Sequence, residues 1–225
     1  MSSGTPDWLT RDRLMRGLVV AWFFVVEVFL VFQFLPAVHA TATYNALGLT
    51  RLLASACFML FVAMMVWLTM VREQPRLQAA GPRPRITALL GTNLILLSAF
   101  FLPARGPLDL VEAVASSVLI LTGDVLSVVV IRRLGRSFSI MAEARGLVTD
   151  GPYALVRHPL YLVEEIAIAG VFIQVASWPA ALLFAVHFGF QVQRMRNEEG
   201  VLIRAFPRDY PPYAAKTARL IPGIW

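Results

Sequence analysis

The sequence predicts an all-α, polytopic membrane protein with a bundle of about six membrane helices. Of its 225 residues, 58% are hydrophobic and only 15% are charged, whereas a soluble domain has about 25% charged residues. The mean hydropathy is +0.68, and the apolar residues gather in runs about as long as a bilayer is thick. The composition therefore argues against a soluble globular protein, and the single cysteine, Cys57, rules out an internal disulfide bond.

Five apolar regions supply the expected helices. A bilayer core of about 30 Å needs roughly 20 helical residues, and the regions cover residues 17–38, 52–71, 86–102, 110–131 and 160–192. The last region is too long for one crossing at about 1.5 Å per residue. Because Ser177-Trp178-Pro179 interrupts it, we expect the last two helices to form a hairpin whose second arm begins at Pro179.

The distribution of arginine predicts the orientation. Arginines are frequent before residue 17, in residues 71–85 and 132–159, and in the tail from Arg194, whereas only Arg51 and Arg105 fall on the other side. The positive-inside rule then predicts a multi-pass protein with both termini and both of these loops in the cytoplasm, at the inner membrane if the cell is bacterial. The net charge of +6 fits this topology, so no nucleic-acid partner is expected.

Three acidic residues lie inside the expected spans, where ionisable groups are costly and often functional. They are Glu27, Glu112 and Asp124, of which Asp124 is the strongest candidate because it lies near the cytoplasmic end of its span. The alternatives are a position at the interface for Glu112, and a neutral or hydrogen-bonded carboxyl for the other two. No metal site is expected, because the histidines and the cysteine lack the spacing of ligands: His39, His158, His187 and Cys57.

The first segment with reactive side chains precedes the hairpin. A turn at Asp150-Gly151-Pro152 is followed by Arg157-His158-Pro159, and Pro159 suits the first turn of a helix. The N-terminus of that helix presents free N–H groups and partial positive charge, which favour an anionic group. The alternative is that Arg157 and His158 only anchor the helix at the interface.

The second segment begins at Arg194. Arg194 and Glu198 are four residues apart, so they share one helix face. Alone, such a pair is most often an ordinary surface ion pair. Taken together, the two segments place a helix N-terminus, a histidine and an Arg/Glu pair at the same membrane face, which frames a site for a charged cofactor beside lipid.

These two segments resemble the isoprenylcysteine carboxyl methyltransferase family of integral-membrane, S-adenosyl-L-methionine-dependent enzymes. The similarity covers about the last 90 residues, namely LVTDGPYALVRHPLY over 147–161, RxxxEExxLxxxFxxxYxxY over 194–213, and RLIP over 219–222. The length and the apolar regions predict one integral-membrane domain over residues 1–225 with a four-helix part in 1–131, and the resemblance implies a cofactor-binding catalytic part in 132–225. The cofactor pocket would lie between the cytoplasmic loop 132–159 and the C-terminal tail.

The resemblance also implies roles for individual residues. Arg194 and Glu198 would be the catalytic pair, with Arg194 facing the methyl acceptor and Glu198 holding the cofactor. S-adenosyl-L-methionine, which leaves as S-adenosyl-L-homocysteine, would be bound by a larger set: Glu143, Arg145, Gly146, Leu147, Val148, Tyr153, His158, Pro159, Leu160, Tyr161 and Glu198.

The acceptor is expected to be a lipophilic molecule from the bilayer, most simply the carboxylate of an isoprenylated cysteine or a similar prenylated small molecule. A carboxylate is already ionised and needs no base, and Arg194 would orient it through parallel hydrogen bonds. Glu164 and Glu165 depart from the family pattern and are expected to bind substrate, because two carboxylates would attract a phospholipid amine or another amine. Alternatively, one of them pairs with Arg157 or with Arg132 and Arg133.

Two rival classes remain at this level, an NADPH-dependent membrane reductase and a non-catalytic lipid-binding protein. Arginines in residues 132–136 would suit the 2′-phosphate of NADPH.

Two further expectations concern the parts outside the helices. Residues 75–85 are interpreted as a solvated connector, and the tail as a lid in which Pro211-Pro212 stops any helix; its aromatic residues are Phe206, Tyr210, Tyr213 and Trp225.

Overall fold

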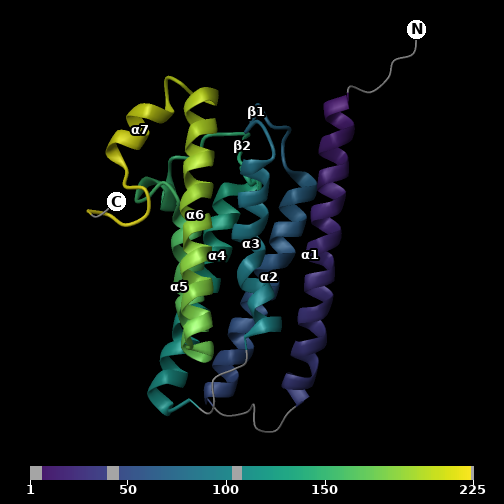
Figure 1. Cartoon of the computed structure of the whole chain (residues 1–225), viewed down its shortest axis with the longest axis vertical. Coiled ribbons are helices and arrows are strands. Elements are labelled where there is room, and N and C mark those ends of the chain that lie inside the picture. The colour runs from purple at the N-terminus through teal and green to yellow at the C-terminus, as the bar shows by residue number, and fades with distance from the viewer. Residues whose placement is uncertain (1–6, 40–45, 103–107, 224–225) are drawn as a thin grey trace.

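The computed structural model describes residues 7–39, 46–102 and 108–223 and is mostly helical. Within these ranges the chain forms six long α-helices and a short seventh, which are labelled in Figure 1. They are α1 (Asp7–His39), α2 (Ala46–Val71), α3 (Arg83–Phe101), α4 (Leu110–Leu134), α5 (Pro159–Val175), α6 (Trp178–Ala205) and α7 (Tyr210–Lys216). Two short strands, β1 (Leu77–Gln78) and β2 (Glu143–Ala144), lie at the end of the bundle where α6 ends.

Proline and capping residues set where the helices begin. Pro159 is the first residue of α5. The hairpin is present as expected, because α6 starts at Trp178, Pro179 lies in its first turn, and the Ser177 hydroxyl accepts a hydrogen bond from the Ala180 N–H. Pro is tolerated there because the first N–H groups of a helix have no helical partner. Glu112 belongs to a capping box with Asp109 at the start of α4.

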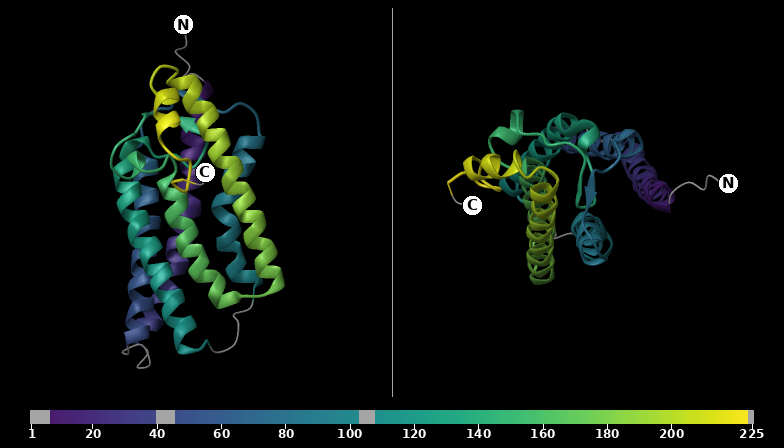
Figure 2. Two further views of the ribbon diagram at one scale, coloured as in Figure 1. Left: turned by 90° about the vertical axis from the view of Figure 1, so that its left-hand side faces the viewer. Right: turned by 90° about the horizontal axis from the view of Figure 1, so that it is seen from above.

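The long helices form two layers. Along one layer, α1 packs on α2, α2 on α4, and α4 on α5, while α3 packs on α6 to form the other. Figure 2 shows this arrangement from above. The tightest contact is between α4 and α5: a Cβ atom added at Gly123 would lie 2.5 Å from the Ala167 nitrogen, and one at Gly170 would lie 2.7 Å from the Ser116 carbonyl oxygen. Glycine is therefore required at both positions for the backbones to approach.

Three helical segments in the described part are long and apolar enough to cross a bilayer, namely Leu14–Pro36, Leu52–Val71 and Leu110–Ser137. These spans support an integral membrane protein, while the expected number of six membrane helices remains a prediction. The start of α1, the α2–α3 connection, the α4–α5 connection and the tail after α6 all lie at one end of the bundle (Figure 1). That end is the one predicted to face the cytoplasm, and the predicted side of the membrane is not tested by the fold. Arg105 lies outside the described residues.

The interpretation of residues 75–85 as a solvated connector holds only in part, because most of these residues are exposed but the segment also pairs with a distant part of the chain. Leu77 and Gln78 form β1, which pairs antiparallel with β2, and the Ala79 N–H donates to the Ala142 carbonyl at 2.9 Å. The connection is held further by Arg145, whose buried guanidinium donates to the Glu73 carbonyl and to the Glu143 carboxylate. Local composition did not reveal this because the partner strand lies about 65 residues later in the chain.

Candidate active site

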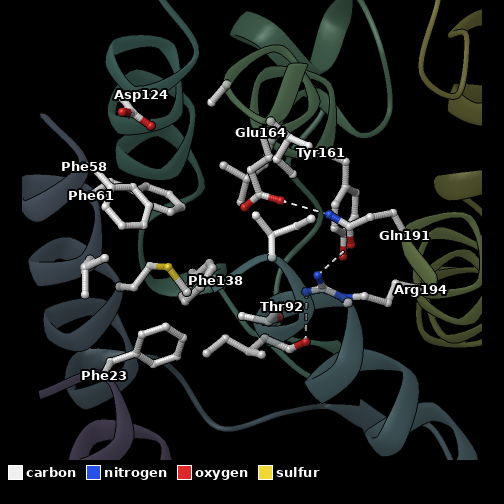
Figure 3. Close-up of a pocket in the computed structure, with 18 of the residues that line it drawn as sticks. Phe23, Phe58, Phe61, Thr92, Asp124, Phe138, Tyr161, Glu164, Gln191 and Arg194 are labelled. Carbon is white, nitrogen blue, oxygen red and sulfur yellow. Dashed lines mark hydrogen bonds between the residues drawn. The ribbon is translucent and has the colours of Figure 1, made fainter. Parts of the chain in front are cut away.

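A cavity of about 1440 Å³ lies between the two helix layers. Its walls come from all six long helices and from the α4–α5 connection. Aromatic and aliphatic side chains of α1 and α2 form one part, and polar groups of α5 and α6 form the other (Figure 3). The cavity thus joins an apolar chamber inside the bundle to a polar compartment at the end where α5 begins.

Most residues that the sequence predicts for the site line this cavity. Those that line it are Glu143, Gly146, Leu147, Val148, Tyr153, His158, Leu160, Tyr161, Glu164, Arg194 and Glu198. Three others do not: Arg145, Pro159 and Glu165. The Arg145 side chain is instead a tie between β2 and the end of α2, and Pro159 serves as the first residue of α5.

The two predicted segments meet at His158. Its Nε2 lies 3.2 Å from Oε1 of Glu199, and its Nδ1 lies 3.9 Å from Oε2 of Glu198. One turn further along α5, the Tyr161 hydroxyl donates to the Glu198 carboxylate. His158 and Tyr161 are both buried. The start of α5 and the end of α6 therefore form one wall, although about 40 residues separate them in the chain.

Glu199 contacts three basic side chains at the edge of the cavity, those of His158, Arg157 and Arg219. Arg219 donates to both of its oxygens, at 3.0 and 2.8 Å, and Arg157 Nη1 lies 3.1 Å from Oε1. Burial alone would raise the pKa of Glu199, but hydrogen bonds from His158 and Arg219, with the charges of His158 and Arg157, lower it to about 2. Glu199 is therefore ionised at neutral pH and fixes the tail against α5.

Backbone contacts complete this attachment of the tail. The Arg157 N–H donates to the Ala218 carbonyl at 2.8 Å, and the His158 N–H donates to the Arg219 carbonyl at 3.1 Å. The Tyr213 hydroxyl donates to the Tyr153 carbonyl at 2.7 Å, and burial raises the pKa of Tyr213 to about 12, so it remains a neutral donor. The tail is thus an integral wall of the polar compartment.

The expectation for the lid needs correction in one respect. Tyr210 and Tyr213 line the cavity, and the Phe206 ring lies outside it, under the guanidinium of Arg76 at 5.5 Å. The prolines at 211 and 212 do not stop a helix, because they occupy the first turn of α7, where the missing N–H groups are not needed. Trp225 lies outside the described residues.

Arg194 lies where the polar and apolar parts of the cavity meet. Its Nη1 donates to Gln191 Oε1 at 2.8 Å, its Nη2 donates to the Ile140 carbonyl at 3.4 Å, and its guanidinium lies 4.9 Å from the centre of the Tyr161 ring. Gln191 in turn donates to Glu164 at 3.2 Å (Figure 3). Because a guanidinium has five N–H donors, Arg194 is oriented by these contacts and still has donors for a ligand.

The two acidic residues at the start of α5 have different environments. Glu164 lines the cavity and bonds to Gln191, whereas Glu165 lies outside the cavity wall with Oε1 3.2 Å from Nε2 of the buried His187. The predicted partners Arg157, Arg132 and Arg133 are therefore wrong. Both contacts run between α5 and α6, and such polar pairs hold helices together in lipid.

Two contributors to the site were missed by the sequence reasoning. Gln191 belongs to a polar stripe on one face of α6, in which successive members are four, three and four residues apart: His187, Gln191, Arg194 and Glu198. This helical spacing indicates from the sequence alone that Gln191 shares a face with Arg194. Gly91 on α3 gave no such signal. A Cβ atom at Gly91 would lie 2.5 Å from Cδ of Arg194, so the absence of a side chain makes room for the arginine.

Comparison with known proteins identifies relatives of the part of the chain that carries this site. Residues 116–204 match the model of the isoprenylcysteine carboxyl methyltransferase (ICMT) family. A protein-S-isoprenylcysteine O-methyltransferase of Schizosaccharomyces pombe is 40% identical over 96 residues, which are 40% of this chain and 41% of that protein. Protein-S-isoprenylcysteine O-methyltransferase A of Arabidopsis thaliana is 33% identical over 113 residues, covering 48% of this chain and 57% of the relative.

A relative with a different name matches the same chain over a shorter segment. The nickel-cobalt-cadmium resistance protein NccN of Alcaligenes xylosoxydans xylosoxydans is 34% identical over 79 residues, which are 35% of this chain and 37% of that protein. The matches span at most 57% of the length of these three relatives. Within the described ranges, no group of three or more His, Cys, Asp or Glu side chains is placed to hold a metal ion.

Proposed function

We propose that this chain, whose residues 116–204 belong to the isoprenylcysteine carboxyl methyltransferase family, is an integral-membrane methyltransferase. It transfers a methyl group from S-adenosyl-L-methionine to a lipophilic acceptor, and the carboxylate of an isoprenylated cysteine or a similar prenylated small molecule is the first candidate. The observation that supports this proposal is the cavity in which Arg194, Glu198 and His158 border an apolar chamber.

The polar compartment fits the methyl donor. Glu198 offers a carboxylate to a cationic sulfonium or ammonium group, and Tyr153, Tyr210 and Tyr213 offer aromatic surface to an adenosyl group. Tyr210 is buried beside Arg157, and both residues line the compartment, so their polar groups would lie next to a bound polar ligand. When bound, the donor supplies an electrophilic methyl group. Glu198, Tyr153 and the backbone of residues 146–148 would hold it.

The residues of this chain mainly have to position the reactants, because a carboxylate acceptor is ionised and needs no base. Arg194 would orient the carboxylate with its remaining N–H donors, and the Tyr161 ring, whose centre lies 4.9 Å from the guanidinium carbon, holds that group beside α5. Tyr161 also fixes the Glu198 carboxylate through its hydroxyl. The tail held by Glu199 would keep water out of the compartment.

The apolar chamber supports an acceptor that arrives from the bilayer. Trp22, Val25 and Phe29 of α1 line the cavity and are also exposed on the surface of the bundle, so the cavity reaches the lipid-facing side between α1 and α3. In the described part of the chain, the Trp22 indole N–H bridges this opening by donating to Asn93 Oδ1 at 2.6 Å.

An amine acceptor is the second candidate, and Glu164 favours it. This carboxyl group faces the cavity beside Arg194, and an amine must lose a proton during methylation, which Glu164 or Glu198 would accept. A phospholipid or another lipophilic amine belongs to this class.

The proposal is tested with purified protein in nanodiscs. S-adenosylhomocysteine should raise the melting temperature, and NADPH should not. Incubation of membranes with radiolabelled methyl donor should then label a lipid-extractable product. Alkaline hydrolysis releases the label from a methyl ester but not from a methylated amine, so it distinguishes the two acceptor classes. Stabilisation by NADPH alone would indicate a reductase, and the absence of any labelled product and of any ligand response would indicate a non-catalytic lipid-binding protein.

A further inference from the structure

The apolar chamber contains one acidic side chain that the proposed reaction does not use. Asp124 of α4 lines the cavity and is 5% exposed. Figure 3 places it on the wall formed by α4, apart from the row of Glu164, Gln191 and Arg194, and above the rings of Phe58 and Phe61. Its neighbour Gly123 lies against Ala167 of α5, so Asp124 lies at about the depth of that residue.

The other carboxyl groups that line the cavity have partners. Glu143 accepts from Ser139 and Arg145, Glu164 accepts from Gln191, and Glu198 accepts from Tyr161. Asp124 has neither a hydrogen bond nor an ion pair within the described ranges, and the Cys57 thiol lies within range of its charge. An acidic residue inside a membrane bundle is costly without a partner and usually has a functional one.

The geometry also limits what the partner is. Ala167 is eight residues beyond Pro159, so Asp124 lies about 12 Å deeper in the bundle than the start of α5 at 1.5 Å per residue. A small soluble cation would have to leave water and enter an apolar chamber to reach it, which is unfavourable. A cation that is attached to an apolar chain enters with that chain.

We propose that Asp124 is a binding subsite for the ammonium group of a lipophilic amine that occupies the apolar chamber. This inference rests on the proposed function in one respect, namely that the chamber receives the acceptor, and it adds to the acceptor a basic nitrogen that lies deeper in the chamber than the group that is methylated. The ammonium would bond to the Asp124 carboxylate, and the chain would contact the apolar side chains of α1 and α2.

The test uses three probes with the same chain, hexadecylamine, hexadecanol and hexadecanoate, added at equal mole fractions to the protein in nanodiscs. Binding is measured as displacement of one bound fluorescent fatty-alcohol probe. The wild-type protein should bind the amine about tenfold tighter than the alcohol, equivalent to about 1.4 kcal/mol, and the alcohol tighter than the acid. This comparison needs no variant, and equal binding of amine and alcohol would overturn the proposal.

Variants then locate the preference. Asp124→Asn keeps the shape of the side chain and should reduce the ratio between amine and alcohol to about one, which removes the whole factor of about ten. Ser117→Ala, which alters the same face of α4 two turns away, should keep the wild-type ratio. A ratio that is unchanged in Asp124→Asn, or lost only in Glu164→Gln, would also reject the subsite.

Binding of S-adenosylhomocysteine, measured in parallel, separates this inference from the proposed function. Retained cofactor binding in Asp124→Asn shows that the variant is folded, so that its probe ratio is decisive. If the wild-type protein does not bind S-adenosylhomocysteine but prefers the amine, the proposed function fails while the subsite stands. If it binds S-adenosylhomocysteine and does not prefer the amine, the subsite fails alone.

Discussion

His158 lies with Nε2 3.2 Å from Oε1 of Glu199, a residue that follows it by 41 positions. Glu199 is ionised and accepts hydrogen bonds only, so it favours the tautomer of His158 that bears a proton on Nε2. In that tautomer Nδ1 bears no proton, and it lies 3.9 Å from Oε2 of Glu198 on the side of the cavity. The second carboxylate of the Glu-Glu pair therefore acts as a positioning residue, while the first one lines the cavity.

Replacing Glu199 with Gln should loosen the tail and lower the melting temperature at pH 7. The loss of charge-assisted hydrogen bonds costs about 2 kcal/mol. The pKa of Glu199 is depressed in the folded protein. Its contribution to the free energy of unfolding is therefore complete above pH about 4.5 and is lost as the pH falls toward about 2. The difference in melting temperature between the wild type and the variant should therefore be constant from neutral pH to pH about 5 and should shrink below pH about 4.5. Asp209→Asn, an exposed acid in the tail without a capping bond, is the control, and a difference that grows in acid would contradict the assignment.

Replacing Arg194 with Ala should abolish methyl transfer while S-adenosylhomocysteine still binds. The arginine orients the acceptor, so we expect a loss of about 100-fold or more in kcat, as for other groups that act on the reacting centre. Arg194→Lys should recover little, because lysine lacks the fork of donors. Arg196→Ala changes an exposed arginine two residues later and should leave turnover unaffected. Near-normal turnover in Arg194→Ala would show that another residue orients the acceptor.

Glu198→Gln should weaken binding of the methyl donor more than binding of S-adenosylhomocysteine, because only the donor bears the sulfonium charge. Burial raises the pKa of Glu198 above its usual value, although nearby His158 and Arg194 oppose this effect. The cation favours the ionised carboxyl, so wild-type affinity for the donor should rise with pH through that raised pKa, with release of a proton. Calorimetry in two buffers of different ionisation enthalpy measures the release, and equal effects of the variant on both ligands would disprove the role.

Gly91→Ala should impair the site from a helix that bears none of the predicted residues. The new Cβ would lie 2.5 Å from Cδ of Arg194 and 3.1 Å from Gln191 Oε1, so the arginine must shift. A displacement of about 1 Å can cost about 100-fold in rate, and kcat should fall more than affinity for the cofactor. Gly189→Ala adds the same methyl group to α6 with nothing within 4 Å. If both variants are equally active, Arg194 has more freedom than its contacts indicate.

The sequence predicted the parts of this site that depend on local pattern. Pro159 and Pro179 mark helix starts because proline suits the first turn, and the spacing of Arg194 and Glu198 places them on one face of α6. The sequence did not predict what Arg145 and Leu77 do, since their partners lie far away in the chain. It also misjudged Glu165, whose partner His187 becomes a neighbour only when α5 and α6 face each other.

The attachment of residues 218 and 219 to the start of α5 has a consequence for biosynthesis. When translation reaches the end of α6, the residues that complete the compartment have not yet been added to the chain. Synthesis therefore passes through an intermediate in which the compartment is incomplete, and a stop codon shortly after α6 should give a product that lacks this wall and melts at a lower temperature. A fusion partner or affinity tag placed close to residues 218 and 219 could disturb the compartment as much as a mutation of a residue that lines it.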